Sequence, residues 1–147
     1  MNFLIHILET RPFLLIGMLG LLFFAISIVF YMIFYIYMNV NIKNISKIIF
    51  NNENKYSRPL EPFNFLFLSF LPTTYWREII NIKYGSSFKK LYRKESFYYS
   101  INKEQLTDLL EQNKAYFILQ YIIFPLIALA IICVFVSYIF EKLLANT

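Results

Sequence analysis

The residues most capable of chemistry lie in the middle of the chain, where four cations fall within six positions. Lys89, Lys90, Arg93 and Lys94 form the densest basic cluster in the sequence. Such a cluster can contact the phosphates of lipid headgroups, or it can bind nucleic acid when aromatic residues stand beside it. The cluster is short and lies between two apolar runs, so we expect headgroup contact or simple solvation of a basic loop. We do not expect nucleic acid as a partner.

Groups suited to metal binding or catalysis are scarce. The only histidine is His6, and the only cysteine, Cys133, lies inside an apolar run, so neither can join a cluster of metal ligands. A nucleophile needs a neighbouring base, and no histidine lies between the two apolar runs. We therefore expect no enzyme activity, no metal and no cofactor. An enzyme acting on lipid at the membrane interface is the alternative, and it would use Arg77, Glu78, Lys89 and Tyr92.

Two long apolar runs position these groups. Residues 12–40 and 116–140 contain no charged side chain, and hydrophobic residues make up 59% of the whole chain. As helices, even the shorter run would extend about 37 Å, more than the roughly 30 Å of a hydrocarbon core. The sequence therefore predicts an all-α membrane protein with two transmembrane helices flanking a mostly helical segment. The expected parts are the tail 1–11, helix 12–40, a basic and aromatic segment 41–115, helix 116–140 and the tail 141–147.

The distribution of charge predicts the orientation. Twelve of the 14 Lys and Arg residues lie within 41–115, and the exceptions are Arg11 and Lys142. Positively charged loops stay on the cytoplasmic side. We therefore expect the middle segment in the cytoplasm and both tails outside, in a bacterial inner (plasma) membrane or, alternatively, in an organellar inner membrane.

Local signals predict where the second long helix begins and where it bends. Asn102 and Gln105 resemble a capping box, so the second helix should begin near residue 103 and continue unbroken into 116–140. Pro125 should kink it.

Small residues let helices approach closely in lipid. The candidates for helix packing are Gly17, Gly20, Ala128, Ala130, Cys133 and Ser137.

The apolar stretch 63–71 is too short to span a bilayer. We expect a short helix at the membrane surface or against a partner, because two membrane helices offer little core of their own to cover it. Further helices are expected over 75–84, ended by Gly85, and over 88–98. The residues expected at this interface are Phe63, Phe65, Leu66, Phe67, Phe70 and Trp76.

These features favour a protein that acts by contact with other proteins. The first hypothesis is an accessory or regulatory subunit of a larger membrane complex, whose partners are membrane lipid and either another membrane protein or a second copy of this chain. The alternative is a protective membrane protein of a mobile element, of the immunity or exclusion type. Size, composition and the lack of catalytic groups motivate that alternative by analogy only.

Overall fold

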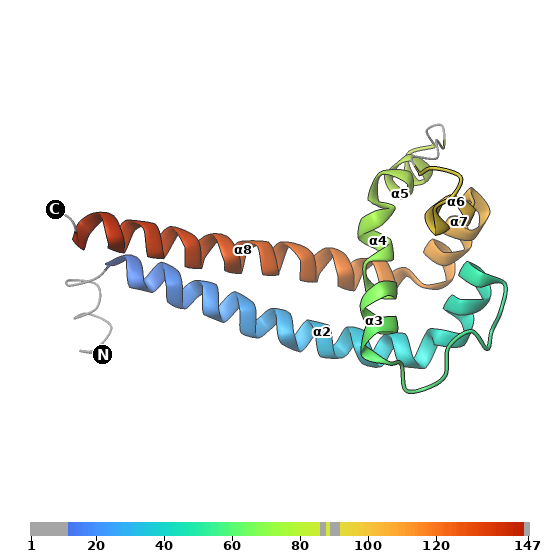
Figure 1. The fold of residues 1–147 in the computed structure, drawn as a ribbon, viewed down its shortest axis with the longest axis horizontal. Helices are drawn as coiled ribbons and strands as arrows, with labels where there is room; N and C mark the ends of the chain where they lie inside the picture. Colours follow the sequence, from blue (N-terminus) through green and yellow to red (C-terminus); the bar gives the residue numbers. More distant parts are fainter. Residues whose placement is uncertain (1–11, 86–87, 89–91, 146–147) are drawn as a thin grey trace. The chain divides into compact units, whose positions relative to one another are not determined.

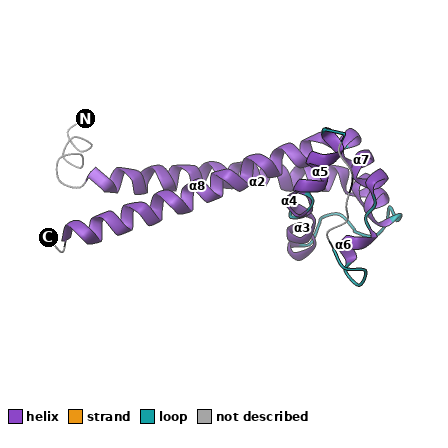
Figure 2. Cartoon of the chain, turned by 90° about the horizontal axis from the view of Figure 1, so that it is seen from above, coloured by secondary structure: helices purple, strands orange, loops and turns teal. Residues whose placement is uncertain are grey.

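The described part of the chain consists of helices and the loops that join them. The computed structural model describes residues 12–85, 88 and 92–145, and Figure 2 shows only helices and loops in them. The predicted all-helical class with two long apolar helices is confirmed for these residues. The helices (Figure 1) are α2 (Pro12–Phe50), α3 (Pro62–Ser69), α4 (Leu71–Thr74), α5 (Trp76–Lys83), α6 (Phe97–Ser100), α7 (Lys103–Gln112) and α8 (Lys114–Ala145).

Helices α2 and α8 are long and apolar enough to cross a membrane, by length and composition. The qualifying segments are Phe13–Phe50, with 38 residues, and Lys114–Leu143, with 30. The helix α2 includes the predicted first run and continues for ten residues beyond Val40 without a break. The helix α8 continues through Pro125.

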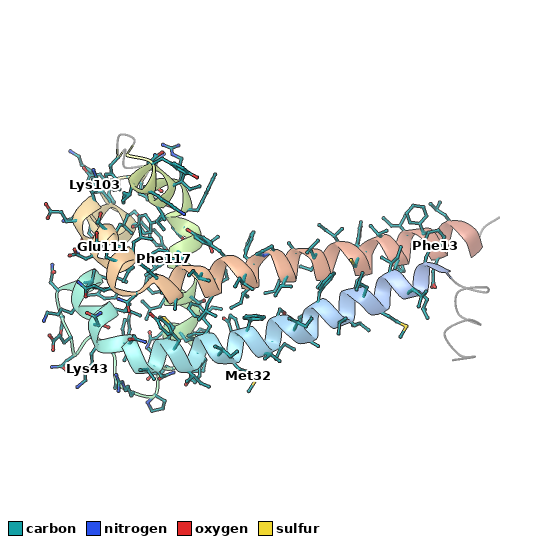
Figure 3. All side chains as sticks on the ribbon, turned by 180° about the vertical axis from the view of Figure 1, so that it is seen from behind. Phe13, Met32, Lys43, Lys103, Glu111 and Phe117 are labelled. Atoms are coloured by element: carbon teal, nitrogen blue, oxygen red, sulfur yellow. The ribbon has the colours of Figure 1, made fainter. Side chains whose placement is uncertain are left out.

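The chain forms two compact units. The paired-helix unit contains the described residues 12–32 and 122–145, and the core unit contains residues 33–121. Figure 3 shows mostly carbon along the helices of the paired-helix unit. Nitrogen and oxygen atoms are frequent on the core unit, where Lys43, Lys103 and Glu111 are labelled.

Small residues bring α2 and α8 together in the paired-helix unit. A Cβ added at Gly17 would lie 2.9 Å from the Ser137 Oγ, and one added at Gly20 would lie 3.0 Å from the Cys133 Cβ. The Ser137 hydroxyl donates to the Phe13 carbonyl at 2.7 Å. Five of the six predicted packing residues therefore meet across this pair, and the sixth, Ala128, is half-buried. The residues that meet are Gly17, Gly20, Ala130, Cys133 and Ser137.

The core unit is assembled on one face of α2. Phe34, Met38, Ile42 and Ile45 recur at helical spacing and are fully buried. The opposing buried side chains come from every other helix of the unit except the four-residue α6. They are Phe65 and Leu68 of α3, Leu71 of α4, Ile79 of α5, Leu106 and Leu109 of α7, and Tyr116 and Phe117 of α8.

The prediction of one continuous helix from residue 103 into the second apolar run is wrong. The helix α7 ends at Gln112, and Asn113 has φ −129° and ψ 49°, outside the helical region. Its backbone N–H still donates to the Leu109 carbonyl, and its side-chain Oδ1 accepts a hydrogen bond from the Tyr37 hydroxyl at 3.3 Å. This partly buried tertiary hydrogen bond offers the chain an alternative to a regular helical turn, and α8 begins at Lys114.

The helix predicted over 88–98 is also wrong in its described part. Residues 92–96 are not helical, and Ser96 caps the short helix α6 by accepting a hydrogen bond from the Tyr98 backbone N–H. The Tyr92 hydroxyl instead donates to the Thr74 carbonyl at 2.9 Å. This contact holds the segment against the end of α4.

The predicted capping box at the start of α7 is confirmed, and it does more than cap one helix. Gln105 Oε1 accepts from the Asn102 backbone N–H, and Asn102 Oδ1 accepts from the Gln105 backbone N–H. Gln105 Nε2 also donates to the carbonyls of Ile48 and Ile49, at 2.8 and 3.3 Å. These carbonyls belong to the last turn of α2, which has no helical N–H to pair with them. One side chain thus joins the start of α7 to the end of α2.

Replacing Gln105 should therefore destabilise the core unit. We expect Gln105→Ala to lower the free energy of unfolding by about 1–2 kcal/mol, since a cap and two carbonyl contacts are lost. Thermal unfolding in detergent, followed by circular dichroism, measures the change. Gln112→Ala is the matched control, because Gln112 lies on the same helix and is exposed. Equal melting temperatures for the two variants would contradict the bridging role.

Candidate functional site

The helix α3 has a buried face and an exposed face. The Phe65 ring packs against Phe34 and Tyr35 of α2, with centroids 5.7 and 5.0 Å apart. Leu68 is fully buried, and its carbonyl accepts a hydrogen bond from the Tyr116 hydroxyl. The expectation that the chain has little core to cover 63–71 is therefore wrong, because this segment is part of the chain's own core.

The other face of α3 is apolar and open. Phe63, Leu66 and Phe70 follow one another at helical spacing and are 85%, 45% and 48% exposed. We call these three residues the α3 strip. Phe67, also expected at the interface, lies between the two faces and packs against Phe97, with ring centroids 5.6 Å apart.

The helix α5 repeats this arrangement. Trp76, which is 56% exposed, and Ile80 lie one turn apart on its open side, and we call them the α5 strip. Glu78 and Ile79 are buried on the opposite side. The helix ends at Lys83, and the predicted terminating residue Gly85 follows the C-cap Tyr84 with a φ of +69°, which suits glycine.

Glu78 is the exceptional group of this site. Its side chain is 1% exposed, and neither carboxylate oxygen has a hydrogen-bond partner among the residues that the structure describes. Two tyrosine hydroxyls that could donate to this carboxylate have other acceptors. Tyr75 donates to the Tyr98 carbonyl, and Tyr92 donates to the Thr74 carbonyl. A buried carboxylate without partners lowers stability, because its hydration is lost and nothing replaces it.

Replacing Glu78 by an apolar residue of similar length should therefore stabilise the fold. We expect Glu78→Met to raise the free energy of unfolding by about 1–3 kcal/mol, the desolvation cost of an unpaired polar group. Chemical denaturation in detergent gives the value. Glu111→Met, at an exposed position of α7, is the control and should change little. A marked loss of stability in Glu78→Met alone would show that the carboxylate has a partner.

Three tyrosines form a cluster beside Glu78. The Tyr92–Tyr98 ring centroids are 5.1 Å apart, and Tyr75 lies 5.7 Å from Tyr92 and 6.0 Å from Tyr98. Burial raises the pKa of Tyr75 well above its ordinary value of 10.0, and the charges of Tyr92, Tyr98 and Glu78 raise it further. Burial also raises the pKa of Tyr92, followed by the effects of Glu78 and Tyr98.

These shifts predict that alkali weakens the core unit. The folded state keeps the Tyr75 proton where the unfolded state loses it. The stability that neutral Tyr75 contributes is therefore fully present below pH 10.0 and is lost as the pH rises through the folded-state pKa. We expect Tyr75→Phe to reduce the slope of unfolding free energy against pH above pH 10. Tyr84→Phe, at an exposed tyrosine, should keep the wild-type slope. Identical slopes in both variants would contradict the burial of the Tyr75 hydroxyl.

The predicted basic cluster is only partly described. Arg93 and Lys94 are exposed, in a loop rather than on a helix, and Lys89 and Lys90 lie outside the described residues. Of the set proposed for an interfacial enzyme, Arg77 is exposed but Glu78 is buried. The described residues do not bring this set together at an open surface. No sequence signal marked Glu78 as buried, because its neighbour Arg77 suggested a solvated pair.

Within the described residues, no group of three or more His, Cys, Asp and Glu side chains is placed to hold a metal ion. Comparison with protein-family models, with curated proteins and with solved structures finds no match to this chain. The features that stand out are the two exposed apolar strips, each on a short helix fixed to a buried core.

Proposed function

We propose that this chain is a small integral membrane protein that acts by protein–protein contact, as an accessory or regulatory subunit of a larger membrane complex. The apolar surfaces of α2 and α8 support the membrane location. Leu21, Met32 and Ile36 of α2, and Ile131 and Phe135 of α8, are each more than 60% exposed. Hydrocarbon is the solvent that suits such a surface.

The charge distribution supports a cytoplasmic core unit. Residues 41–115 hold 12 of the 14 Lys and Arg residues, and positively charged segments next to membrane helices stay on the cytoplasmic side. Exposed Lys43 and Lys103 are placed to meet water or the headgroups of that leaflet. Both ends of the chain then lie on the opposite side of the membrane.

The observation that carries the proposal is the α3 strip. Aromatic residues, phenylalanine included, are enriched at the cores of protein interfaces. Phe63 and Phe70 are presented by a helix whose opposite face is locked into the core through Phe65 and Leu68. Such a pre-ordered surface loses little entropy when it binds.

The position of α3 supports a partner that is itself a membrane protein. The helix packs on Phe34 and Tyr35 of α2. Tyr116 of α8 donates a hydrogen bond to the Leu68 carbonyl of α3, and Tyr121 of α8 donates one to the Pro72 carbonyl of α4. These contacts lie at the ends of the two charge-free runs. A protein that reaches the α3 strip would therefore approach at the level of the membrane surface.

Photo-crosslinking in native membranes tests this proposal. We expect p-benzoylphenylalanine at position 63, 70 or 76 to give one discrete protein adduct, and the Phe63→Ser variant to weaken the adduct formed from position 70. The same probe at Asp108 or Glu111, exposed on α7, is the matched control and should give none. An adduct of twice the chain's mass would identify a second copy as the partner.

Two results would overturn the proposal. Adducts with lipid alone at positions 63, 70 and 76 would assign the strips to the bilayer interface, where aromatic residues also gather. Equal protein adducts from the strips and from α7 would show that crosslinking reports only random collision.

A further inference from the structure

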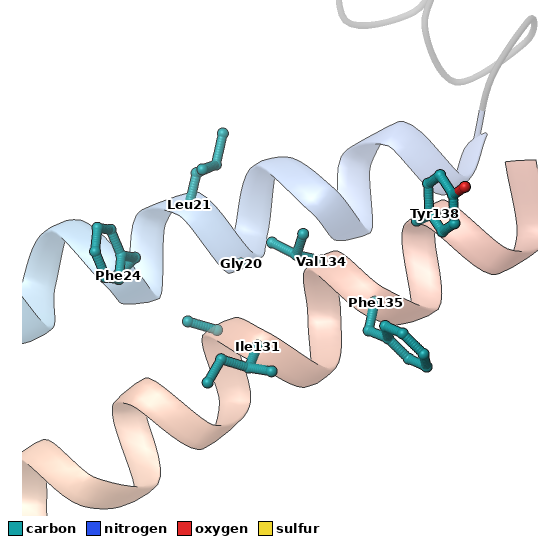
Figure 4. A pocket seen from close by; sticks show the side chains of 8 residues that line it. Gly20, Leu21, Phe24, Ile131, Val134, Phe135 and Tyr138 are labelled. Carbon is teal, nitrogen blue, oxygen red and sulfur yellow. The ribbon is translucent and has the colours of Figure 1, made fainter.

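An apolar groove runs between α2 and α8 in the paired-helix unit (Figure 4). Its volume is about 420 Å³, within the range of ligand pockets. Its lining includes Gly20, Leu21 and Phe24 of α2, and Ala130, Ile131 and Phe135 of α8.

The groove exists because small residues form its floor and large residues form its walls. At Gly20 the helices are so close that an added Cβ would lie 2.9 Å from Val134 Cγ2 and 3.0 Å from the Ala130 carbonyl oxygen. Leu21 and Phe135, by contrast, are more than 60% exposed and rise on either side. The result is an open groove lined by hydrocarbon.

A tyrosine and a lysine follow one another along α8 at and beyond one end of this apolar groove. Tyr138 also lines it, and Lys142 lies one turn further along α8. Ile131, Phe135, Tyr138 and Lys142 are spaced by four, three and four residues, so they share one helix face. Lys142 is exposed and lies about 6 Å beyond Tyr138 along the axis. A hydrocarbon-lined groove, a phenol hydroxyl and an ammonium group therefore follow one another in a line.

We propose that this groove binds one acyl chain of an anionic phospholipid. The chain lies between the walls, Tyr138 meets the ester region, and Lys142 contacts the phosphate. The order of apolar, hydroxyl and cationic groups matches the order of acyl chain, glycerol ester and phosphate in the lipid. This site is separate from the α3 strip and does not depend on the proposed protein partner.

A transmembrane helix is a poorer occupant of the groove. Helices associate closely in lipid through small residues on both partners. Here Gly20, Ala130 and Cys133 already face the contact between α2 and α8. The outer rim consists of exposed large side chains, among them Leu21, Phe24 and Phe135. A flexible acyl chain fits between such side chains, whereas a rigid helix would rest on top of them.

Native mass spectrometry of the full chain tests the proposal with two probes of equal acyl composition, phosphatidylglycerol and phosphatidylcholine. We expect one phosphatidylglycerol to stay bound per chain, and Lys142→Gln to reduce its preference over phosphatidylcholine about fivefold, the effect of one cation near a lipid phosphate. Ile131→Ala should weaken retention of both lipids. Ile132→Ala is the matched control, since Ile132 is an adjacent exposed isoleucine that does not line the groove.

A second measurement does not depend on weakened binding. In a Trp76→Phe background, a tryptophan introduced as Ile131→Trp should be quenched by phosphatidylglycerol with brominated acyl chains, in vesicles of phosphatidylcholine, more strongly than one introduced as Ile132→Trp. Equal quenching at the two positions would overturn the proposal. An effect of Lys142→Gln without one of Ile131→Ala would also overturn it, as would a dimer that excludes lipid.

Discussion

The buried face of α2 from Phe34 to Ile45 is the surface on which the core unit is built. Phe34, Met38, Ile42 and Ile45 are fully buried. Ile42 and Ile45 lie beyond the charge-free run, and removing these two side chains from water contributes roughly 3–6 kcal/mol before the entropy of ordering the chain is subtracted. The short helices cannot be stable alone, since helices of four to ten residues are marginal in water. Their stability comes from packing, since α3 contacts α2 through Phe65 and α5 packs against α7.

Tyrosine hydroxyls complement this apolar packing. Tyr35 donates to the Leu60 carbonyl, Tyr116 to the Leu68 carbonyl and Tyr121 to the Pro72 carbonyl. The Leu60 carbonyl lies in the loop before α3, the Leu68 carbonyl in the last turn of α3 and the Pro72 carbonyl in α4. These hydrogen bonds give the abundant tyrosines of this chain a structural role. Glu78 is the counterexample, a buried group among tyrosines whose hydroxyls bind elsewhere.

The two units present different surfaces to a partner. In the core unit, charged and polar side chains are frequent on the surface, and the α3 and α5 strips are open in addition to the exposed apolar residues of α2 and α8. In the paired-helix unit, apolar side chains cover the outside of both helices, and close contact is made by glycine, alanine and serine. Protein recognition suits the first kind of surface, because aromatic anchors on a fixed helix discriminate between partners. Lipid suits the second.

The sequence by itself determined the features that depend on neighbours in the chain. Two charge-free runs identified α2 and α8, the capping box at Asn102 identified the start of α7, and Gly85 identified the end of α5, since each signal lies within one or two turns of its effect. Tertiary structure decided the rest. The break at Asn113 depends on Tyr37, 76 residues away, and the burial of Phe65 beside exposed Phe63 depends on α2. No local pattern encodes these outcomes, because burial and hydrogen-bond partners belong to the packed chain and not to the residue.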